Sequence, residues 1–299
     1  MNEFLIKIIP IILLFATGWI TRLLRVFTTR DADLFLKLVL NVTLPAMIIA
    51  TAQDMIMDKS LIYLPFIAIM IVVILSIIGK FTGRQLKMNR PDTGSFLVGI
   101  MIMNTGFCLP FIEAIYGRQG VLIANLFDIG NTFMIYTFVY YHAIRYGKNE
   151  SGSLDWKKFL KLPPLWGLLI GFGLRFLNVK IPAMPMLFFE LAGVATTPLI
   201  MLSLGIYFHP RVKRLPKALL AVVLRMGFGF LISYLAVTLL NITGLPRVII
   251  LVSGSAPIGF NTIIFANLEE LDKEFASTMV SISIVIGLVL LPTLLYLFR

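Results

Sequence analysis

The stretch MNTGFCLP at residues 103–110 breaks an apolar segment with polar residues, a glycine and a proline. A second stretch of the same kind, SGSAPIGFN at residues 253–261, breaks another apolar segment at a matching place in the second half of the chain. In hydrocarbon every backbone polar group needs a partner, so unwound backbone persists only where it is buried in protein or lines a cavity. Paired breaks in corresponding segments of two halves indicate the binding site of a secondary transporter.

The composition is that of an all-α polytopic membrane protein. Of 299 residues, 59% are hydrophobic and only 14% are charged, and the mean hydropathy is +0.93. A soluble domain carries about 25% charged residues. The single cysteine, Cys108, excludes an internal disulfide and metal sites built from several cysteines. The first apolar run begins at Asn2 without a small-residue cleavage site, so we expect a retained helix there and not a signal peptide.

The sequence contains no nucleophile–base pair, P-loop or metal motif. We therefore expect neither an enzyme nor an ATP-driven pump, and neither a metal centre nor a cofactor. The formal net charge of +11 comes from short basic clusters between apolar runs and not from a continuous basic stripe. Such clusters indicate topology signals facing an anionic leaflet of the lipid bilayer, and not a nucleic-acid-binding surface.

Ten apolar runs are long enough to cross about 30 Å of hydrocarbon. They are residues 3–24, 34–53, 60–80, 94–115, 120–143, 163–178, 184–208, 216–240, 246–267 and 275–298. Eighteen of the 26 basic residues follow the first, third, fifth, seventh and ninth runs. By the positive-inside rule those loops are cytoplasmic, so we expect both termini outside the cytoplasm, in a protein of the plasma (inner) membrane.

The two halves of the chain resemble each other at an offset of 153 residues. The identical pairs at this offset are Pro10–Pro163, Gly18–Gly171, Arg22–Arg175, Thr43–Thr196 and Pro45–Pro198. The breaks correspond at an offset of 147, from Pro110 to Pro257. Each half has five helices, an odd number, so the second half must enter the membrane from the opposite side as an inverted repeat. We assign residues 1–143 to the first repeat, 144–162 to a cytoplasmic linker and 163–299 to the second repeat.

Five segments in order resemble the auxin efflux carrier family, which includes plant auxin carriers and bacterial permeases for malate or malonate. The segments are residues 41–46, 104–117, Asp128 with Asn131, 197–205 and 256–266. The resemblance covers nearly the whole chain. It implies a scaffold of helices and a transport core in which helices 4 and 9 unwind and cross. One departure is Cys108, which stands where family members usually have glycine, two positions before the proline.

Asn104 and Asn261 are the candidate substrate-binding side chains, beside Pro110 and Pro257. Half-helix N-termini at a break expose unpaired N–H groups and a partial positive charge, so they attract an anion without a dedicated arginine. The two asparagines would add neutral donors to a carboxylate. In the alternative interpretation, they only satisfy backbone groups that the breaks set free.

Asp128 is the candidate ion-coupling residue because a carboxylate inside a membrane span is expensive and often functional. Asn125, Asp128 and Asn131 recur every three residues and form one polar stripe on an apolar helix. The stripe predicts a site that binds H⁺ or Na⁺. The alternative is a hydrogen bond between buried helices, and the residues alone do not choose between the two.

Three threonines beside prolines, Thr43, Thr196 and Thr197, are supporting polar residues that we expect to bond carbonyls left free by proline. Arg225 lies within helix 8 and has two interpretations. It binds an anion, or it extends toward the cytoplasm or pairs within the scaffold, which is commoner for a basic residue in a membrane helix.

These observations favour a secondary transporter of a small organic anion, a carboxylate, working by alternating access. One alternative is a ten-helix exporter of the drug/metabolite type, which the two breaks argue against. Another is a membrane receptor that binds its ligand without moving it. The expected partners are the small anion and the bilayer, and a homodimer is left open.

Overall fold

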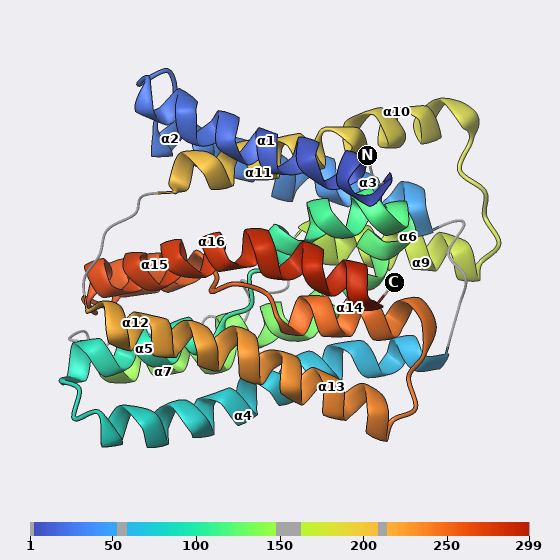
Figure 1. Cartoon of the computed structure of the whole chain (residues 1–299). Helices are drawn as coiled ribbons and strands as arrows, with labels where there is room; N and C mark the ends of the chain where they lie inside the picture. The colour runs from blue at the N-terminus through green and yellow to red at the C-terminus, as the bar shows by residue number, and fades with distance from the viewer. Residues whose placement is uncertain (1–2, 53–58, 148–162, 209–213, 299) are drawn as a thin grey trace. The chain divides into compact units, whose positions relative to one another are not determined.

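The described part of the chain folds into helices. The computed structural model describes residues 3–52, 59–147, 163–208 and 214–298 (Figure 1). Three π-helices, η1 (Val39–Thr43), η3 (Ile135–Val139) and η4 (Val223–Phe228), join neighbouring α-helices, and one 3-10 helix, η2 (Lys59–Ile62), leads directly into α4. The α-helices are α1 (Glu3–Leu23), α2 (Thr29–Leu38), α3 (Leu44–Ala52), α4 (Tyr63–Gln85), α5 (Arg90–Met101), α6 (Thr105–Met134), α7 (Tyr140–Tyr146), α9 (Pro163–Phe176), α10 (Ala183–Val194), α11 (Thr196–Tyr207), α12 (Leu215–Val222), α13 (Gly229–Leu239), α14 (Gly244–Gly254), α15 (Asn261–Leu268) and α16 (Lys273–Phe298).

Seven helical segments of the described residues are long and apolar enough to cross a membrane. They are Phe4–Leu23, Thr29–Ala52, Tyr63–Gln85, Thr105–Tyr146, Ala183–Tyr207, Leu215–Leu239 and Lys273–Phe298. The chain is therefore a multi-pass membrane protein. In the other predicted runs the helices are short, such as α5 with 12 residues, α14 with 11 and α15 with 8. The arrangement of ten membrane-crossing helices in two inverted halves remains a prediction.

Gly117 interrupts the helical geometry of α6 at the boundary between two predicted runs. Its φ is 62° and its ψ is −161°, a conformation that glycine adopts without the penalty of a Cβ. The runs predicted at residues 94–115 and 120–143 lie on either side of it. The sequence therefore predicted this turn between spans, although α6 continues through it.

The chain forms two compact units, and each draws on both halves of the sequence. Unit 1 comprises Met1–Lys59, Leu109–Asn125 and Leu160–Phe208, and unit 2 comprises Ser60–Cys108, Leu126–Phe159 and His209–Arg299. The predicted repeats and the compact units are thus different divisions of the chain. Of the predicted linker 144–162, residues 148–162 lie outside the described residues.

Within unit 1, small residues let helices approach closely. A Cβ on Gly18 of α1 would lie 2.2 Å from the Leu202 carbonyl oxygen of α11, and α1 runs beside α11 in Figure 1. A Cβ on Gly171 of α9 would lie 3.4 Å from the Cα of Ile49 in α3. Gly18 and Gly171 are 153 residues apart, and so are Ile49 and Leu202. Each glycine thus lies against the residue that the offset of the predicted repeat pairs with it, although the atom nearest to a Cβ on Gly171 is Cβ of Ala52, at 2.7 Å.

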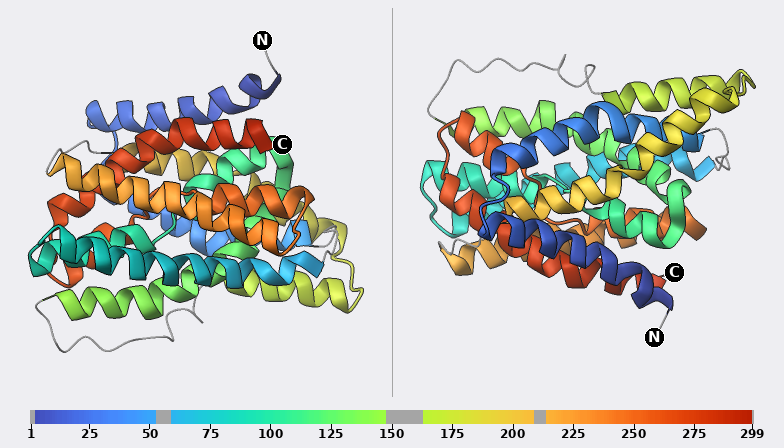
Figure 2. Two further views of the ribbon diagram at one scale, coloured as in Figure 1. Left: turned by 60° about the horizontal axis from the view of Figure 1, so that its bottom comes forward. Right: turned by 90° about the horizontal axis from the view of Figure 1, so that it is seen from above.

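Unit 2 packs the broken segments among long helices. Figure 2 shows α12, η4 and α13 as one continuous helical segment, in orange. The helix α5 packs against α4, α7 and α16, and α14 packs against α13 and α16. Fully buried aromatic side chains, Phe96, Phe107, Phe127 and Phe275, fill the interior of the unit.

Candidate functional site

Both helix breaks lie where the sequence predicted them, and they meet within unit 2. Helix α5 ends at Met101 and α6 begins at Thr105, while α14 ends at Gly254 and α15 begins at Asn261. The N–H of Asn104 donates to the carbonyl of Pro257 (2.9 Å), and the N–H of Gly259 donates to the carbonyl of Ile102 (3.2 Å). These bonds form one antiparallel bridge, Met103 with Ile258. The two breaks therefore satisfy each other's backbone groups, as hydrocarbon surroundings require.

The proline of the first predicted break does not lie in the unwound backbone. Only residues 102–104 leave helical geometry there, and Pro110 lies inside α6. The prediction of a proline-centred first break is wrong in this respect, whereas Pro257 does lie in the second break. Pro110 and Pro257 therefore have different backbone geometry, helical in α6 and unwound in the second break. Pro110 is in the second turn of α6, where it removes one backbone bond and the helix nevertheless continues.

Asn104 both caps a helix and presents a free donor. Its Oδ1 accepts from the N–H of Phe107 (3.2 Å) at the start of α6. The side chain is only 9% exposed, and its Nδ2 has no partner among the described residues. Asn261 begins α15 and is half-buried. The two interpretations of Asn104 are therefore compatible, because one oxygen serves the backbone and the amide nitrogen remains available.

Two hydroxyls that the sequence analysis did not single out also lie at the second break. Ser253 and Thr262 are fully buried, and neither hydroxyl has a hydrogen-bond partner in the part of the chain that the structure describes. Ser253 is next to the last residue of α14, and Thr262 is in the first turn of α15. Their positions flanking Pro257 were the only signal available in the sequence.

Arg225 neither extends toward water nor forms an ion pair among the described residues. It is fully buried on η4, where its Nε donates to the carbonyl of Ala256 (3.3 Å) and its Nη2 donates to the carbonyl of Gly254. Its Nη1 has no partner within the described ranges. The prediction that Arg225 extends toward the cytoplasm or pairs within the scaffold is therefore wrong. Its side chain instead bonds the backbone of the second break.

Close packing of α13 on α14 holds this arginine in place. A Cβ on Gly229 would lie 2.1 Å from the Gly254 carbonyl oxygen and 2.6 Å from Nη2 of Arg225. A Cβ on Gly254 would lie 1.8 Å from the hydroxyl oxygen of Ser233. Both positions accept only glycine, because any larger side chain would separate the two helices.

The Asp128 carboxylate is held by three side-chain donors. Its Oδ1 accepts from the hydroxyl of Thr105 (2.6 Å) and from Nδ2 of Asn131 (2.7 Å), and its Oδ2 accepts from the hydroxyl of Thr132 (2.9 Å). Asn131 also bonds both backbone groups of Met103, at 3.0 and 3.3 Å. Asp128 and Asn131 thus anchor the first break. These bonds agree with the alternative in which Asp128 forms structural hydrogen bonds. Its role in ion coupling remains a prediction.

Asn125, the third member of the predicted stripe, does not join this cluster. It belongs to unit 1, and its Nδ2 donates to the carbonyl of Val121 (2.8 Å) one turn earlier in its own helix. This bond uses the amide nitrogen of Asn125, and the predicted role of its oxygen as a ligand beside Asp128 remains a prediction. Among the described residues, no group of three or more His, Cys, Asp or Glu could hold a metal ion.

The three threonines beside prolines bond other side chains, all within unit 1. The hydroxyl of Thr196 donates to the hydroxyl of Thr43 (3.0 Å), and the hydroxyl of Thr197 donates to Oε2 of Glu113. Their described bonds thus differ from the expected ones to carbonyls next to proline. Glu113 had no expected partner, because a contact between residues 84 positions apart has no local sequence signal.

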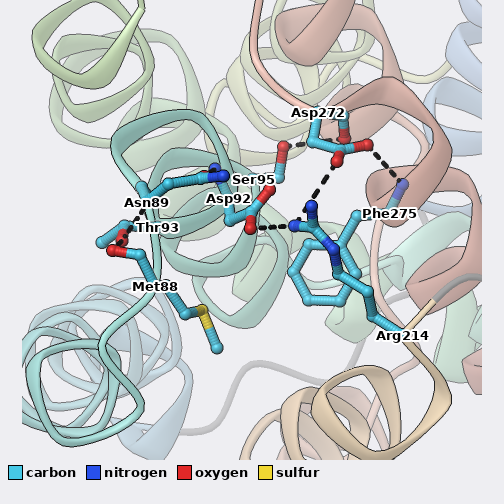
Figure 3. Close-up of polar contacts among 8 residues, drawn as sticks. All are labelled: Met88, Asn89, Asp92, Thr93, Ser95, Arg214, Asp272 and Phe275. Atoms are coloured by element: carbon cyan, nitrogen blue, oxygen red, sulfur yellow. Dashed lines mark hydrogen bonds and ion pairs between the residues drawn. The ribbon is translucent and has the colours of Figure 1, made fainter.

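An ion-pair cluster joins the starts of three helices of unit 2 (Figure 3). Arg214, which precedes α12, pairs with Asp92 in the first turn of α5 and with Asp272 (3.5 Å) before α16. The Oδ1 of Asp272 accepts from the N–H of Phe275 (2.9 Å), and its carbonyl accepts from the hydroxyl of Ser95 (2.9 Å). The cluster ties the ends of these helices together and is separate from the helix breaks.

Comparison with known proteins gives one family match over nearly the whole chain. Residues 3–296 match the family described as membrane transport protein. An uncharacterised transporter of Methanocaldococcus jannaschii is 24% identical over 296 residues, covering 95% of both chains. A second uncharacterised transporter, of Methanothermobacter thermautotrophicus, is 25% identical over 292 residues with the same coverage. These matches confirm the resemblance that the sequence segments indicated.

Proposed function

The chain belongs to the family of membrane transport proteins, and from this premise we propose that it is a secondary transporter of a small organic anion. The substrate is a carboxylate, and it crosses the plasma membrane by alternating access. The family comprises transporters and not enzymes in general, which agrees with the lack of a catalytic motif in the sequence.

The observation that carries this proposal is a set of buried donors without acceptors at the helix breaks. They are Asn104 Nδ2, Arg225 Nη1 and the hydroxyls of Ser253 and Thr262, none of which has a partner among the described residues. An unsatisfied buried donor costs about 1–3 kcal/mol, so an occupant with acceptors would relieve that cost. A carboxylate offers two acceptor oxygens. The N-termini of α6 and α15 add partial positive charge at the same breaks.

Repeated contacts support an internal symmetry of the kind on which alternating access depends. In unit 1, Gly18 approaches Leu202 and Gly171 approaches Ile49, at the offset of 153 residues. In unit 2, the two breaks pair with each other through the bridge between Met103 and Ile258. These contacts favour two inverted five-helix repeats, with unit 2 as the substrate-binding core and unit 1 as the scaffold.

The driving force and orientation belong to the same proposal. The gradient of the substrate, or of H⁺ or Na⁺ bound at Asp128, drives transport. Both termini lie outside the cytoplasm and residues 144–162 lie inside, in keeping with the bias of basic residues.

Counterflow in proteoliposomes tests the proposed function. Purified protein is reconstituted, loaded with unlabelled acetate or succinate, and given a trace of the labelled carboxylate outside. We expect transient accumulation of label above its equilibrium level, because only a carrier exchanges the two pools. Binding of the carboxylates without counterflow would identify a receptor. Counterflow of cationic or neutral drugs alone would identify an exporter of another substrate class.

A further inference from the structure

We propose that Arg225 is the anion-selecting residue of the site, donating through Nη1 to a carboxylate oxygen of the substrate. This inference rests on the proposed function and deepens it, since it assigns the positive charge that sets the substrate class. The sequence analysis, by contrast, predicted that helix N-termini and two neutral asparagines bind the anion without an arginine.

The first argument is the lack of a counter-ion. Arg225 is fully buried, and none of the described residues pairs a carboxylate with it. A buried charge without a partner is strongly unfavourable, and removing the partner of a buried pair costs several kcal/mol. An anionic substrate would supply that partner during each transport cycle. A neutral substrate would leave the charge uncompensated.

The second argument is how the guanidinium is used. Arginine carries five N–H donors on a planar fork. The Nε and Nη2 edge is occupied by the carbonyls of Ala256 and Gly254, and Nη1 is left without a partner in the described residues. The carbonyl of Gly254 is at the C-terminal end of α14, where a cation is favourable. The helix end therefore explains why Nε and Nη2 are bonded there. It does not explain the Nη1 donors, which have no partner among the described residues.

The third argument is that the guanidinium bonds the same backbone segment, residues 254–257, that bonds the backbone of Asn104. Its acceptor Ala256 precedes Pro257, whose carbonyl binds the backbone of Asn104. The thiol of Cys108 lies between the two breaks, 3.7 Å from the Asn104 carbonyl oxygen and 3.9 Å from that of Val252. Arg225 therefore joins the strand pairing on which Asn104 presents its own free amide.

The fourth argument is the irregular helix that presents the side chain. Arg225 lies on the π-helix η4, between α12 and α13. Single π-helical turns are rare within helices and are frequent at functional sites. Gly229, one turn later, leaves the space that Nη2 occupies. Arg225 thus lies on π-helical backbone, beside a glycine that leaves room for its guanidinium.

The test uses matched ligands and matched variants of the purified full chain. The ligands are acetate and succinate against their neutral counterparts, acetamide and succinamide, measured by thermal shift and by inhibition of carboxylate counterflow. The variants are Arg225→Gln, which removes the charge, Arg225→Lys, which keeps it without the fork, and Arg84→Gln on the exposed face of α4 as control.

We expect wild type and Arg84→Gln to prefer carboxylate over amide at least tenfold. Arg225→Gln should lose at least tenfold of that preference, while Arg225→Lys should keep the preference but bind the carboxylate at least tenfold more weakly. If wild type shows counterflow of the amides as readily as of the carboxylates, no anion is selected and the inference is overturned. This holds even if the arginine variants fail to fold.

An unchanged preference in a monodisperse Arg225→Gln protein would also overturn the inference, leaving the proposed function intact. Unchanged carboxylate affinity in Arg225→Lys would do the same, because a compact ammonium bonded to the two carbonyls places no donor where Nη1 of the planar fork lies. A wild-type protein that neither shifts nor transports with any carboxylate would instead contradict the proposed function itself.

Discussion

The hydroxyl of Thr196 donates to the hydroxyl of Thr43, 3.0 Å away, although 153 residues separate them in the chain. That separation is the offset at which the two halves of the sequence match. Equivalent residues of two repeats contact each other only near an axis of symmetry that relates the repeats. A threonine pair at this offset is therefore what the predicted repeat would place near such an axis, and the repeat itself remains a prediction.

Gly229→Ala should destabilise the protein and impair selection of the carboxylate. The new methyl would lie 2.1 Å from the Gly254 carbonyl oxygen and 2.6 Å from Nη2 of Arg225, so α13 must move away from α14. Overpacking of this kind costs about 1–3 kcal/mol. Thermal unfolding in detergent measures the loss of stability, and ligand titration measures the loss of selection.

Gly227→Ala is the matched control, two residues earlier in η4. A Cβ there would have its nearest neighbour 3.9 Å away, at Val223 Cγ1. We expect no destabilisation, because alanine favours a helix over glycine by about 1 kcal/mol. Equal loss of stability in the two variants would show that the contact with Gly254 is unimportant.

Arg214→Gln should lower stability without changing the ligand preference. The substitution leaves Asp92, whose side chain is 6% exposed, without its cation. Breaking a fully buried pair costs about 3–5 kcal/mol. We expect about 1–3 kcal/mol here, because the side chain of Arg214 is 31% exposed. In the double variant with Asp92→Asn, part of the loss should be recovered. A double variant less stable than Arg214→Gln would contradict a charge-pairing role.

Asn104→Ala should weaken substrate binding in addition to removing a helix cap. A hydrogen bond to a charged ligand contributes about 1.5–3 kcal/mol, or roughly 10- to 150-fold in affinity. The control is Asn89→Ala, since Asn89 caps α5 by the same kind of bond, to the N–H of Asp92 (2.9 Å). Both variants should lose about 1 kcal/mol of stability, but only Asn104→Ala should lose affinity. Equal affinities at sub-saturating carboxylate would leave Asn104 with the cap alone.

Residues 144–162 should be accessible only from the cytoplasm, and the two termini only from outside. A cysteine introduced at Ser151, in a chain with Cys108 replaced by serine, should resist a membrane-impermeant maleimide in intact cells and react after lysis. The reason is the excess of basic residues in the loops on that side. Reaction in intact cells would reverse the proposed orientation.

The sequence predicted the helix breaks because polar residues, glycine and proline have few other uses inside an apolar segment. It misplaced the role of Pro110, which α6 accommodates in its second turn with the loss of one backbone bond. The contacts of Arg225 could not be predicted, because burial by Gly229 and Gly254 depends on packing between helices. The hydrogen bond between Thr197 and Glu113 could not be predicted for the same reason.

Asp128→Asn should abolish concentrative uptake while leaving carboxylate binding and passive exchange intact. The amide keeps the size of the carboxylate and one acceptor oxygen for the hydroxyl of Thr105 and the amide of Asn131, but it cannot bind or release a proton. It also lacks the charge that would attract Na⁺. The measurement is gradient-driven accumulation in proteoliposomes over a pH series, with sodium present and absent.

Thr132→Val provides the matched control for Asp128→Asn. It removes the donor to Oδ2 of Asp128 (2.9 Å) and keeps the charge, so a purely structural cluster should be affected by both variants in a similar way. If Asp128 couples transport to an ion, Thr132→Val should retain accumulation that Asp128→Asn loses. Undiminished accumulation by Asp128→Asn at every pH, with and without sodium, would restrict Asp128 to anchoring the first break through Thr105 and Asn131.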